Sequence, residues 1–187
     1  MGKRSKFEHR KNDFYPTPIE AVQPLVEFLP KHIFKFYEPC AGDGRLVNHL
    51  HKLSPGISMG HTDIDPQCDW VGKKDAFEVK FPLNIDYIIT NPPWSRWLLH
   101  PLILHFSKQA PTWLLFDADW IHTKQAVQYL PLCKKVVSIG RVKWIEGSKH
   151  TGKDNSCWYL FDYNDTTSET TFHPNPKWTQ ECLQIPI

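Results

Sequence analysis

The stretch "FYEPCAGDGRLVNHL", residues 36–50, joins an apolar run to a helical pattern through a turn that contains two glycines. The apolar run ends at Pro39, and Gly42 and Gly44 follow. Glycines in such a turn let the backbone approach a ligand where Cβ atoms would collide, and the new helix offers unpaired N–H groups. The stretch therefore predicts a strand, a ligand-binding turn and a helix, as at the start of many α/β sheets.

The turn also limits the kind of ligand that it can hold. No Gly-Lys-Ser/Thr follows it, so it is not a phosphate loop, and its glycines do not complete a G-x-G-x-x-G pattern. Asp43 stands between the two glycines and would repel a phosphate. The same carboxylate suits a ligand that carries an ammonium or a sulfonium group.

Acidic residues follow at the end of the next predicted strand, in "HTDIDP". Asp63 and Asp65 lie 21 and 23 residues beyond Gly42, near the spacing of a carboxylate that binds ribose hydroxyls. Asp65 is favoured because it stands at the very end of the strand, and the alternative is that one of the two caps the following turn. Further on, Asp75 could accept a hydrogen bond from an adenine amino group while Phe77 packs against the ring.

The motif "NPPW", residues 91–94, directly follows the apolar run "IDYIIT". Two prolines end a central strand abruptly, since neither has a backbone N–H. The side-chain oxygen of Asn91 and the carbonyl of Pro92 could hold an –NH₂ group by both hydrogens, which favours a pyramidal nitrogen with a localised lone pair. Trp94 offers a face on which a base could stack. Taken alone, the motif is equally compatible with an ordinary turn after a strand.

Short strands alternate with helices over most of the chain, which predicts a mostly parallel α/β sheet. Apolar runs predict strands at 34–39, 57–65, 85–91, 111–120, 134–145 and 155–163, and a shorter one within 73–81. Helical spacing predicts helices at 17–29, 44–53, 95–109 and 122–130. The last two strands have no helix between them, so we expect an antiparallel hairpin. Thr17 is expected to cap the first helix, and Pro101 to interrupt the third.

The chain divides into three parts by composition. Residues 13–163 form one α/β domain, residues 1–12 read as a mobile basic arm, and residues 164–187 as an irregular tail. The net charge of +2 and a pI of about 8.2 permit nucleic-acid binding without demanding it. The five cysteines show no C-x-x-C pair or zinc-like spacing, and the histidines show no metal-binding pattern, so we expect reduced thiols, a cytoplasmic location and no metal. No apolar stretch approaches membrane-spanning length.

Four stretches in one order carry a family resemblance: "DFYPTP" (13–18), "EPCAGDG" (38–44), "TDIDP" (62–66) and "NPPW" (91–94). Together they resemble S-adenosylmethionine-dependent adenine-N6 DNA methyltransferases, including small phage-type ones. The resemblance implies a Rossmann-like class I methyltransferase fold for residues 13–163, with a mostly parallel seven-stranded sheet and an antiparallel last strand. It also implies S-adenosylmethionine as the cofactor.

The resemblance assigns three sets of site residues. The catalytic set is Asn91, Pro92, Pro93 and Trp94. The cofactor-binding set is Phe14, Tyr15, Thr17, Glu38, Cys40, Gly42, Asp43, Asp63, Asp65, Asp75, Ala76, Phe77 and Asn91. The nucleic-acid set from the resemblance is Lys149, Lys153, Asn155 and Ser156, beside the target base. The positive charge of Lys3, Arg4, Lys6, Arg96 and Lys143 adds these residues as expected phosphate contacts. Each of these cations is also compatible with ordinary solvated surface. Asp119 and Trp120 either face the pocket or have a structural role, and Trp158 is expected in the core.

The expected activity is methyl transfer to the N6 amino group of adenine in DNA. The stretch between "NPPW" and the last strand leaves no room for a large target-recognition insert, so relaxed sequence specificity is expected. The alternatives are a methyltransferase acting on an RNA adenine or a protein glutamine amide, and a catalytically silent S-adenosylmethionine-binding protein. DNA is the expected partner, RNA the alternative, and the setting a bacterial or phage-infected cell.

Overall fold

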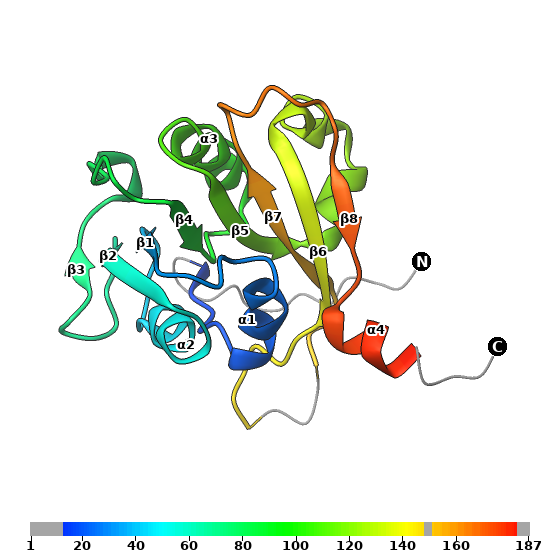
Figure 1. Cartoon of the computed structure of the whole chain (residues 1–187). Coiled ribbons are helices and arrows are strands. Elements are labelled where there is room, and N and C mark those ends of the chain that lie inside the picture. The colour runs from blue at the N-terminus through cyan, green and yellow to red at the C-terminus, as the bar shows by residue number, and fades with distance from the viewer. Residues whose placement is uncertain (1–12, 148–150, 183–187) are drawn as a thin grey trace.

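The computed structural model describes residues 13–147 and 151–182 of the chain, and the side chains only as far as residue 179 (Figure 1). One eight-stranded sheet has the order β3-β2-β1-β4-β5-β7-β6-β8. Its strands are β1 Phe34–Glu38, β2 Gly56–Asp63, β3 Gly72–Lys73, β4 Tyr87–Thr90, β5 Thr112–Asp117, β6 Cys133–Arg141, β7 Asn155–Phe161 and β8 Thr171–His173. Its helices are α1 Ile19–Val26, α2 Arg45–Leu53, α3 Arg96–Ser107 and α4 Pro176–Cys182.

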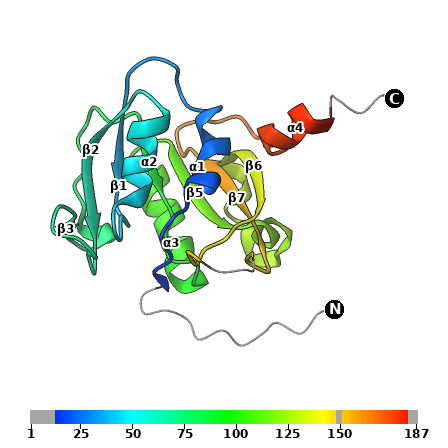
Figure 2. The ribbon, with the colours of Figure 1, turned by 90° about the horizontal axis from the view of Figure 1, so that it is seen from below.

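Both faces of the sheet are covered, by α1 and α2 on one side and by α3 with short 3-10 turns on the other (Figure 2). The alternation along β5 shows this directly. Trp113 and Leu115 point into the core beneath α1 and α2, whereas Leu114 and Phe116 point into the core beneath α3. Side chains alternate along a strand, so a strand buried on both faces has to be apolar throughout, as this one is.

The order of the strands places the loops that follow β1 and β4 side by side. These two strands pair in parallel, with Phe36 opposite Tyr87, and the chain then moves outward from them in opposite directions along the sheet. The point at which a doubly wound sheet reverses its order is where its ligands bind, beyond the carboxyl ends of the strands. The glycine turn and the "NPPW" motif therefore meet at that edge.

The antiparallel hairpin of the last predicted strands is confirmed. β7 pairs antiparallel with both β6 and β5, so it is inserted between them and runs against the rest of the sheet. The sheet has one strand more than the seven expected, because β8 pairs in parallel with β6. That strand and α4 lie in the stretch from residue 164 onward that was expected to be irregular.

Two predicted elements, a strand within 73–81 and a helix at 122–130, are absent from the described residues, each for a local reason. The range 73–81 holds no strand of its own beyond the end of β3, because Asp75 accepts the N–H of Phe77 and starts a 3-10 turn at Ala76–Glu78. The predicted helix at 122–130 is replaced by 3-10 turns at Lys124–Ala126 and Leu130–Leu132, where backbone hydrogen bonds such as Ala126 N–H to the Thr123 carbonyl join residues three apart.

Pro101 does not interrupt α3, which runs without a break from Arg96 to Ser107. A proline inside a helix removes the hydrogen bond to the carbonyl four residues earlier. Here that residue is Trp97, and both side chains are exposed, so water can satisfy the carbonyl.

Candidate functional site

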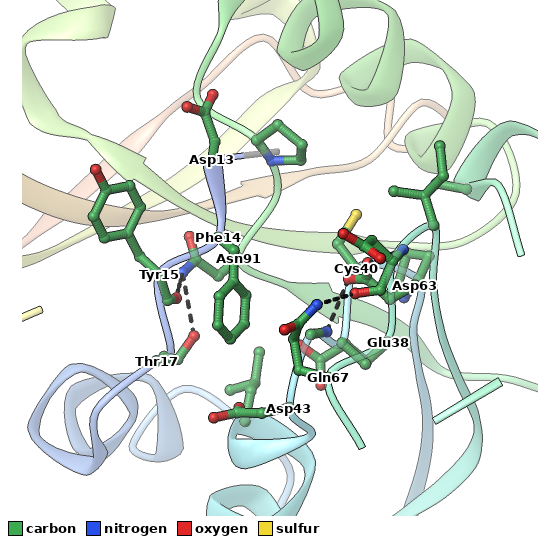
Figure 3. Close-up of a pocket in the computed structure, with 18 of the residues that line it drawn as sticks. Asp13, Phe14, Tyr15, Thr17, Glu38, Cys40, Asp43, Asp63, Gln67 and Asn91 are labelled. Carbon is green, nitrogen blue, oxygen red and sulfur yellow. Dashed lines mark hydrogen bonds between the residues drawn. The ribbon is translucent and has the colours of Figure 1, made fainter. Parts of the chain in front are cut away.

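A cavity lies at the carboxyl ends of β1, β2 and β4 (Figure 3). One wall is the strap, residues 13–17, which precedes α1. The other walls come from the glycine turn, the loop after β2, the 3-10 turn that contains Phe77, and the start of α3. Of the predicted cofactor residues, all thirteen line it: Phe14, Tyr15, Thr17, Glu38, Cys40, Gly42, Asp43, Asp63, Asp65, Asp75, Ala76, Phe77 and Asn91.

The glycine turn adopts a backbone that other residues rarely take. Gly42 and Gly44 have φ angles of 53° and 75°, in the left-handed region. A Cβ atom on Gly42 would also lie 2.5 Å from Cε2 of Phe14 in the strap. The turn is therefore shaped so that the strap can lie close against it.

Asp63 holds this turn in place with both of its carboxylate oxygens. Oδ2 accepts the N–H of Gly42 at 2.8 Å, and Oδ1 accepts the N–H of Asp65 at 2.8 Å. Asp63 therefore caps the turn, which was the alternative to ribose binding for one of Asp63 and Asp65. Asp65 lines the same cavity, so it remains the candidate for ribose hydroxyls.

The lining of the cavity is acidic. Six carboxyl side chains reach it and, among the described lining residues, there is no Lys, Arg or His; the six are Asp13, Glu38, Asp43, Asp63, Asp65 and Asp75. Asp43 is partly neutralised by Arg45, whose Nε lies 2.8 Å from its Oδ2. Such a site opposes a phosphate and favours a ligand with a positive charge.

Glu38 is the most buried of these carboxyls, at 1% exposed, and its Oε2 has no hydrogen-bond partner. Burial raises the pKa of Glu38 well above its ordinary value, and the nearby Asp63 and Asp43 raise it further. The carboxyl therefore holds its proton more readily than a solvated glutamate does, and a cation beside it would favour the ionised form.

Burial also raises the pKa of the Cys40 thiol, with the negative charge of Asp63 as the second cause. The thiol stays protonated at neutral pH, so Cys40 contributes shape to the cavity instead of a reactive thiolate.

Part of the cavity lining is apolar. Ile64, Phe77, Leu98 and Leu102 line it, and Phe77 is 40% exposed. Asp75 stands beside this group. The sequence did not single out Ile64, Leu98 or Leu102, because apolar residues beside a motif look the same whether they fill a core or line a site.

Asn91 stands at the end of β4 with its side chain in three hydrogen bonds (Figure 3 draws two of them). Nδ2 donates to the carbonyl oxygen of Tyr15 and to Oγ1 of Thr17, each at 3.2 Å. Oδ1 accepts the indole N–H of Trp94 at 3.1 Å. The prediction that Thr17 caps α1 was wrong: the N-cap is Pro18, with no side-chain bond, and the Thr17 hydroxyl faces Asn91 instead.

The other residues of the motif differ in where they lie. Pro93 lines the cavity, whereas Pro92 is buried and does not. Trp94 does not line it either: its indole N–H also donates to the carbonyl of Leu115 at 3.1 Å, and its ring packs edge-to-face on Trp144, with centroids 5.5 Å apart.

The predicted nucleic-acid residues are only partly brought together. Ser156 is fully buried within β7, so it has no surface to offer a substrate, and its prediction was wrong. Arg96 is exposed and donates to Oε1 of Gln125 at 2.7 Å, and Lys143, Lys153 and Asn155 are exposed. Four more cations lie outside the described residues: Lys3, Arg4, Lys6 and Lys149.

Two of the tryptophans have structural roles. Trp120 is buried at 1% exposed and donates to Nε2 of His100 at 3.0 Å, so it does not face the cavity, and Asp119 does not line it. Trp158 is in the core as expected, where it donates to the carbonyl of Ala21 at 2.7 Å.

Asp13 and Gln67 line the cavity but were not predicted to do so. Asp13 accepts the hydroxyl of Ser95 at 2.6 Å, which joins the strap to the residue that follows "NPPW". The position of Asp13 directly before "FYPTP" was the feature of the sequence that could have predicted its place at the cavity. Gln67 donates its backbone N–H to the carbonyl of Gly42, a contact made across the fold that its sequence neighbours do not indicate.

Within the described residues, no group of three or more His, Cys, Asp and Glu side chains could hold a metal ion. In the same part of the chain, no helix has the length and apolar character needed to cross a membrane.

No protein-family model and no curated protein matches the sequence. Solved structures do match the fold. A Pyrococcus horikoshii protein described as an RNA methyltransferase has a TM-score of 0.60 at 14% identity, over 86% of this chain and 93% of that one. A Listeria monocytogenes protein described as a class I S-adenosylmethionine-dependent methyltransferase has a TM-score of 0.56 at 11% identity, over 88% of this chain and 66% of that one.

A third match is a Vibrio vulnificus protein described as the modification subunit of a type I restriction enzyme. Its TM-score is 0.55 at 13% identity, over 93% of this chain and 54% of that one. This chain therefore spans about half to two thirds of two of the three proteins. The strand order, the reversed β7 and these matches show that the chain has the class I S-adenosylmethionine-dependent methyltransferase fold.

Proposed function

We propose that this protein transfers a methyl group from S-adenosylmethionine to the N6 amino group of adenine in DNA, with relaxed sequence specificity. The observation that carries the proposal is the position of Asn91. Its amide stands at the carboxyl end of β4, in the lining of a cavity that combines six carboxyl side chains with a group of apolar residues.

The described lining residues fit this cofactor. The buried, unpartnered Oε2 of Glu38 is a partner for the positive charge of the methionine part, and Asp65 is a partner for ribose hydroxyls. Phe77, Leu98 and Leu102 offer an apolar slot for the adenine ring, beside the carboxylate of Asp75. A cofactor that carries phosphates fits this acidic lining less well.

The cofactor supplies, when bound, a methyl group whose bond to sulfur breaks with its electron pair left on a neutral thioether. Asn91 acts on the other reactant. An exocyclic aromatic amine is a weak nucleophile because its lone pair is delocalised into the ring. Asn91 Oδ1 and the backbone carbonyl of Pro92 are the proposed acceptors for the two hydrogens of the substrate amine. The lone pair is then localised on the amine nitrogen and forms the new bond to the methyl carbon. The nitrogen, now positively charged, loses one proton to solvent.

A base in a duplex has to leave the helix to reach the partly buried amide of Asn91, so the substrate nucleotide is flipped out or single-stranded. Between Asn91 and β7, the described residues are taken up by α3, β5, 3-10 turns and β6, which belong to the fold itself. This argues against a large recognition insert between Asn91 and β7 and supports relaxed specificity.

The amine chemistry is shared by RNA adenine and by protein glutamine amides, so the substrate polymer is the part to test first. Purified protein and S-adenosylmethionine with a labelled methyl group are incubated with duplex DNA, single-stranded DNA, total RNA and a cell-protein extract in parallel. Asn91→Ala serves as the blank. We expect the label to appear in DNA with the wild-type protein and not with Asn91→Ala. Label in RNA or in protein would show that the substrate is that polymer instead of DNA. Bound cofactor without transfer to any polymer would contradict the proposal.

A further inference from the structure

The side chain of Asn91 is held at both ends by groups of opposite hydrogen-bonding character. A primary amide has two donor hydrogens on Nδ2 and two acceptor lone pairs on Oδ1. Both donors are used, by the Tyr15 carbonyl and the Thr17 hydroxyl, and one lone pair is used by the indole N–H of Trp94. One lone pair of Oδ1 is left for a substrate.

This arrangement fixes which way round the amide stands. A rotation by 180° would place Oδ1 against the carbonyl oxygen of Tyr15 and Nδ2 against the indole N–H of Trp94. Both contacts would then pair like with like, acceptor with acceptor and donor with donor. The Tyr15 carbonyl and the Trp94 indole therefore select one orientation of the Asn91 side chain, and the Thr17 hydroxyl, which can donate or accept, adds a third bond to it.

Trp94 is itself held firmly enough to do this. Its N–H is shared between Oδ1 of Asn91 and the carbonyl of Leu115 in β5, each at 3.1 Å. Its ring meets Trp144, from the segment after β6, edge-to-face at 89°. Of the three large aromatic side chains, phenylalanine has no donor and tyrosine carries an O–H at the far tip of its ring, so only the indole of tryptophan supplies a ring N–H.

We propose that Trp94 is a positioning residue, whose indole N–H and the strap together orient the amide of Asn91 so that the remaining lone pair of Oδ1 faces the substrate amine. This rests on the proposed function and goes beyond the expectation that Trp94 serves as a stacking surface. It also explains why the chain carries Asn and not Asp at position 91: a carboxylate there would face the carbonyl oxygen of Tyr15 with no proton between them.

The test compares Trp94→Phe, which keeps an aromatic face but removes the N–H, with Trp113→Phe as the matched control. Trp113 is buried, at 1% exposed, and its indole nitrogen has no partner among the described residues, so the control removes an N–H that positions nothing. A second pair is Thr17→Val, which removes the acceptor, and Thr17→Ser, which keeps the hydroxyl. These variants are followed by kcat, by KM for the substrate polymer and by cofactor Kd.

We expect Trp94→Phe and Thr17→Val each to lower kcat about ten- to a hundred-fold, as small misplacements of a reacting group do. For Trp94→Phe, which lies outside the cavity lining, KM and cofactor Kd should stay within about threefold, since only orientation is lost. Thr17→Ser should recover most of the rate that Thr17→Val loses. The kcat of Asn91→Asp should fall at least as far as that of Trp94→Phe. A stacking role alone predicts the reverse: Trp94→Phe near wild type, or a raised KM with kcat unchanged.

A readout without turnover separates this inference from the proposed function. In a ¹H–¹⁵N spectrum of the wild-type chain, the two Asn91 side-chain protons, assigned by their loss in Asn91→Ala, should be protected from exchange. Trp94→Phe and Thr17→Val should shift them and speed their exchange, and Trp113→Phe should not. If the wild-type protein transfers no methyl group, the proposed function is wrong. If neither Trp94→Phe nor Thr17→Val shifts the Asn91 resonances, the inference about Trp94 is wrong, whatever the activity.

Discussion

At the scale of single residues, Glu38 connects the stability of the protein to the charge of its ligand. The pKa of its carboxyl is raised above the ordinary value of 4.5, chiefly by burial. A group that binds its proton more tightly in the folded chain makes stability fall as pH rises from about 4.5 through the raised pKa. The ligand-free protein is therefore destabilised at neutral pH by a carboxyl that a bound cation would stabilise.

Glu38→Gln tests this link because it keeps the shape of the side chain and removes its titration. We expect the ligand-free variant to lose less thermal stability than the wild type between pH 5 and pH 8, measured by Tm over a pH series. We also expect it to bind S-adenosylmethionine more weakly in calorimetry, because the carboxylate no longer offsets the positive charge. Equal pH slopes of Tm in the two proteins would show that Glu38 is not the linked group.

The residues at the site were predictable to different degrees. Asn91, Gly42 and Asp65 stand at strand ends in recognisable motifs, and the structure places all three at the cavity. Thr17 was misread because Thr-Pro before a helical pattern is a local capping signal. A hydrogen bond to Asn91, 74 residues away, determines its position instead, and a local pattern does not contain that contact.

At the scale of elements, the glycine turn between β1 and α2 connects backbone strain with ligand binding. Gly42→Ala would place a Cβ 2.5 Å from the Phe14 ring and hold a non-glycine residue at φ 53°. We expect a loss of about 1–2 kcal/mol from the backbone alone, and weaker cofactor binding because the strap is displaced. Denaturant unfolding and calorimetry measure the two effects.

Gly72→Ala is the matched control for that variant. Its nearest neighbour would be Cγ2 of Thr62 at 3.4 Å, and its φ lies outside the left-handed region. It should therefore leave cofactor affinity unchanged. A Gly42→Ala protein with the affinity and stability of this control would show that the close approach of Phe14 to the turn has no role.

The elements that the sequence predicted best are those with the strongest periodic signal. β5 and the β6–β7 hairpin carry continuous or alternating apolar runs, and both were placed correctly. β8 was missed because three residues, Thr171–His173, form a strand only through pairing with β6. A strand that depends on a partner distant in sequence has no signal of its own.

At the scale of the whole molecule, the basic residues ahead of the fold are expected to add affinity for nucleic acid without sequence preference. Deletion of residues 1–11 removes Lys3, Arg4, Lys6, Arg10 and Lys11. We expect DNA affinity to fall and the slope of log K against log salt to flatten by about 0.9 for each phosphate contact that is lost. Cofactor affinity should not change. Identical salt slopes for the full and the shortened chain would show that these cations do not contact DNA.

The measurement that tests the central claim most directly is the location of the transferred methyl group. Duplex and single-stranded DNA are incubated with the wild-type chain and S-adenosylmethionine carrying a heavy-isotope methyl group, then digested to nucleosides for mass spectrometry. The proposed function predicts heavy N6-methyladenine with the wild type and a yield at least about a hundredfold lower with Asn91→Ala. Label on another atom or base, or equal yields from the two proteins, would contradict it.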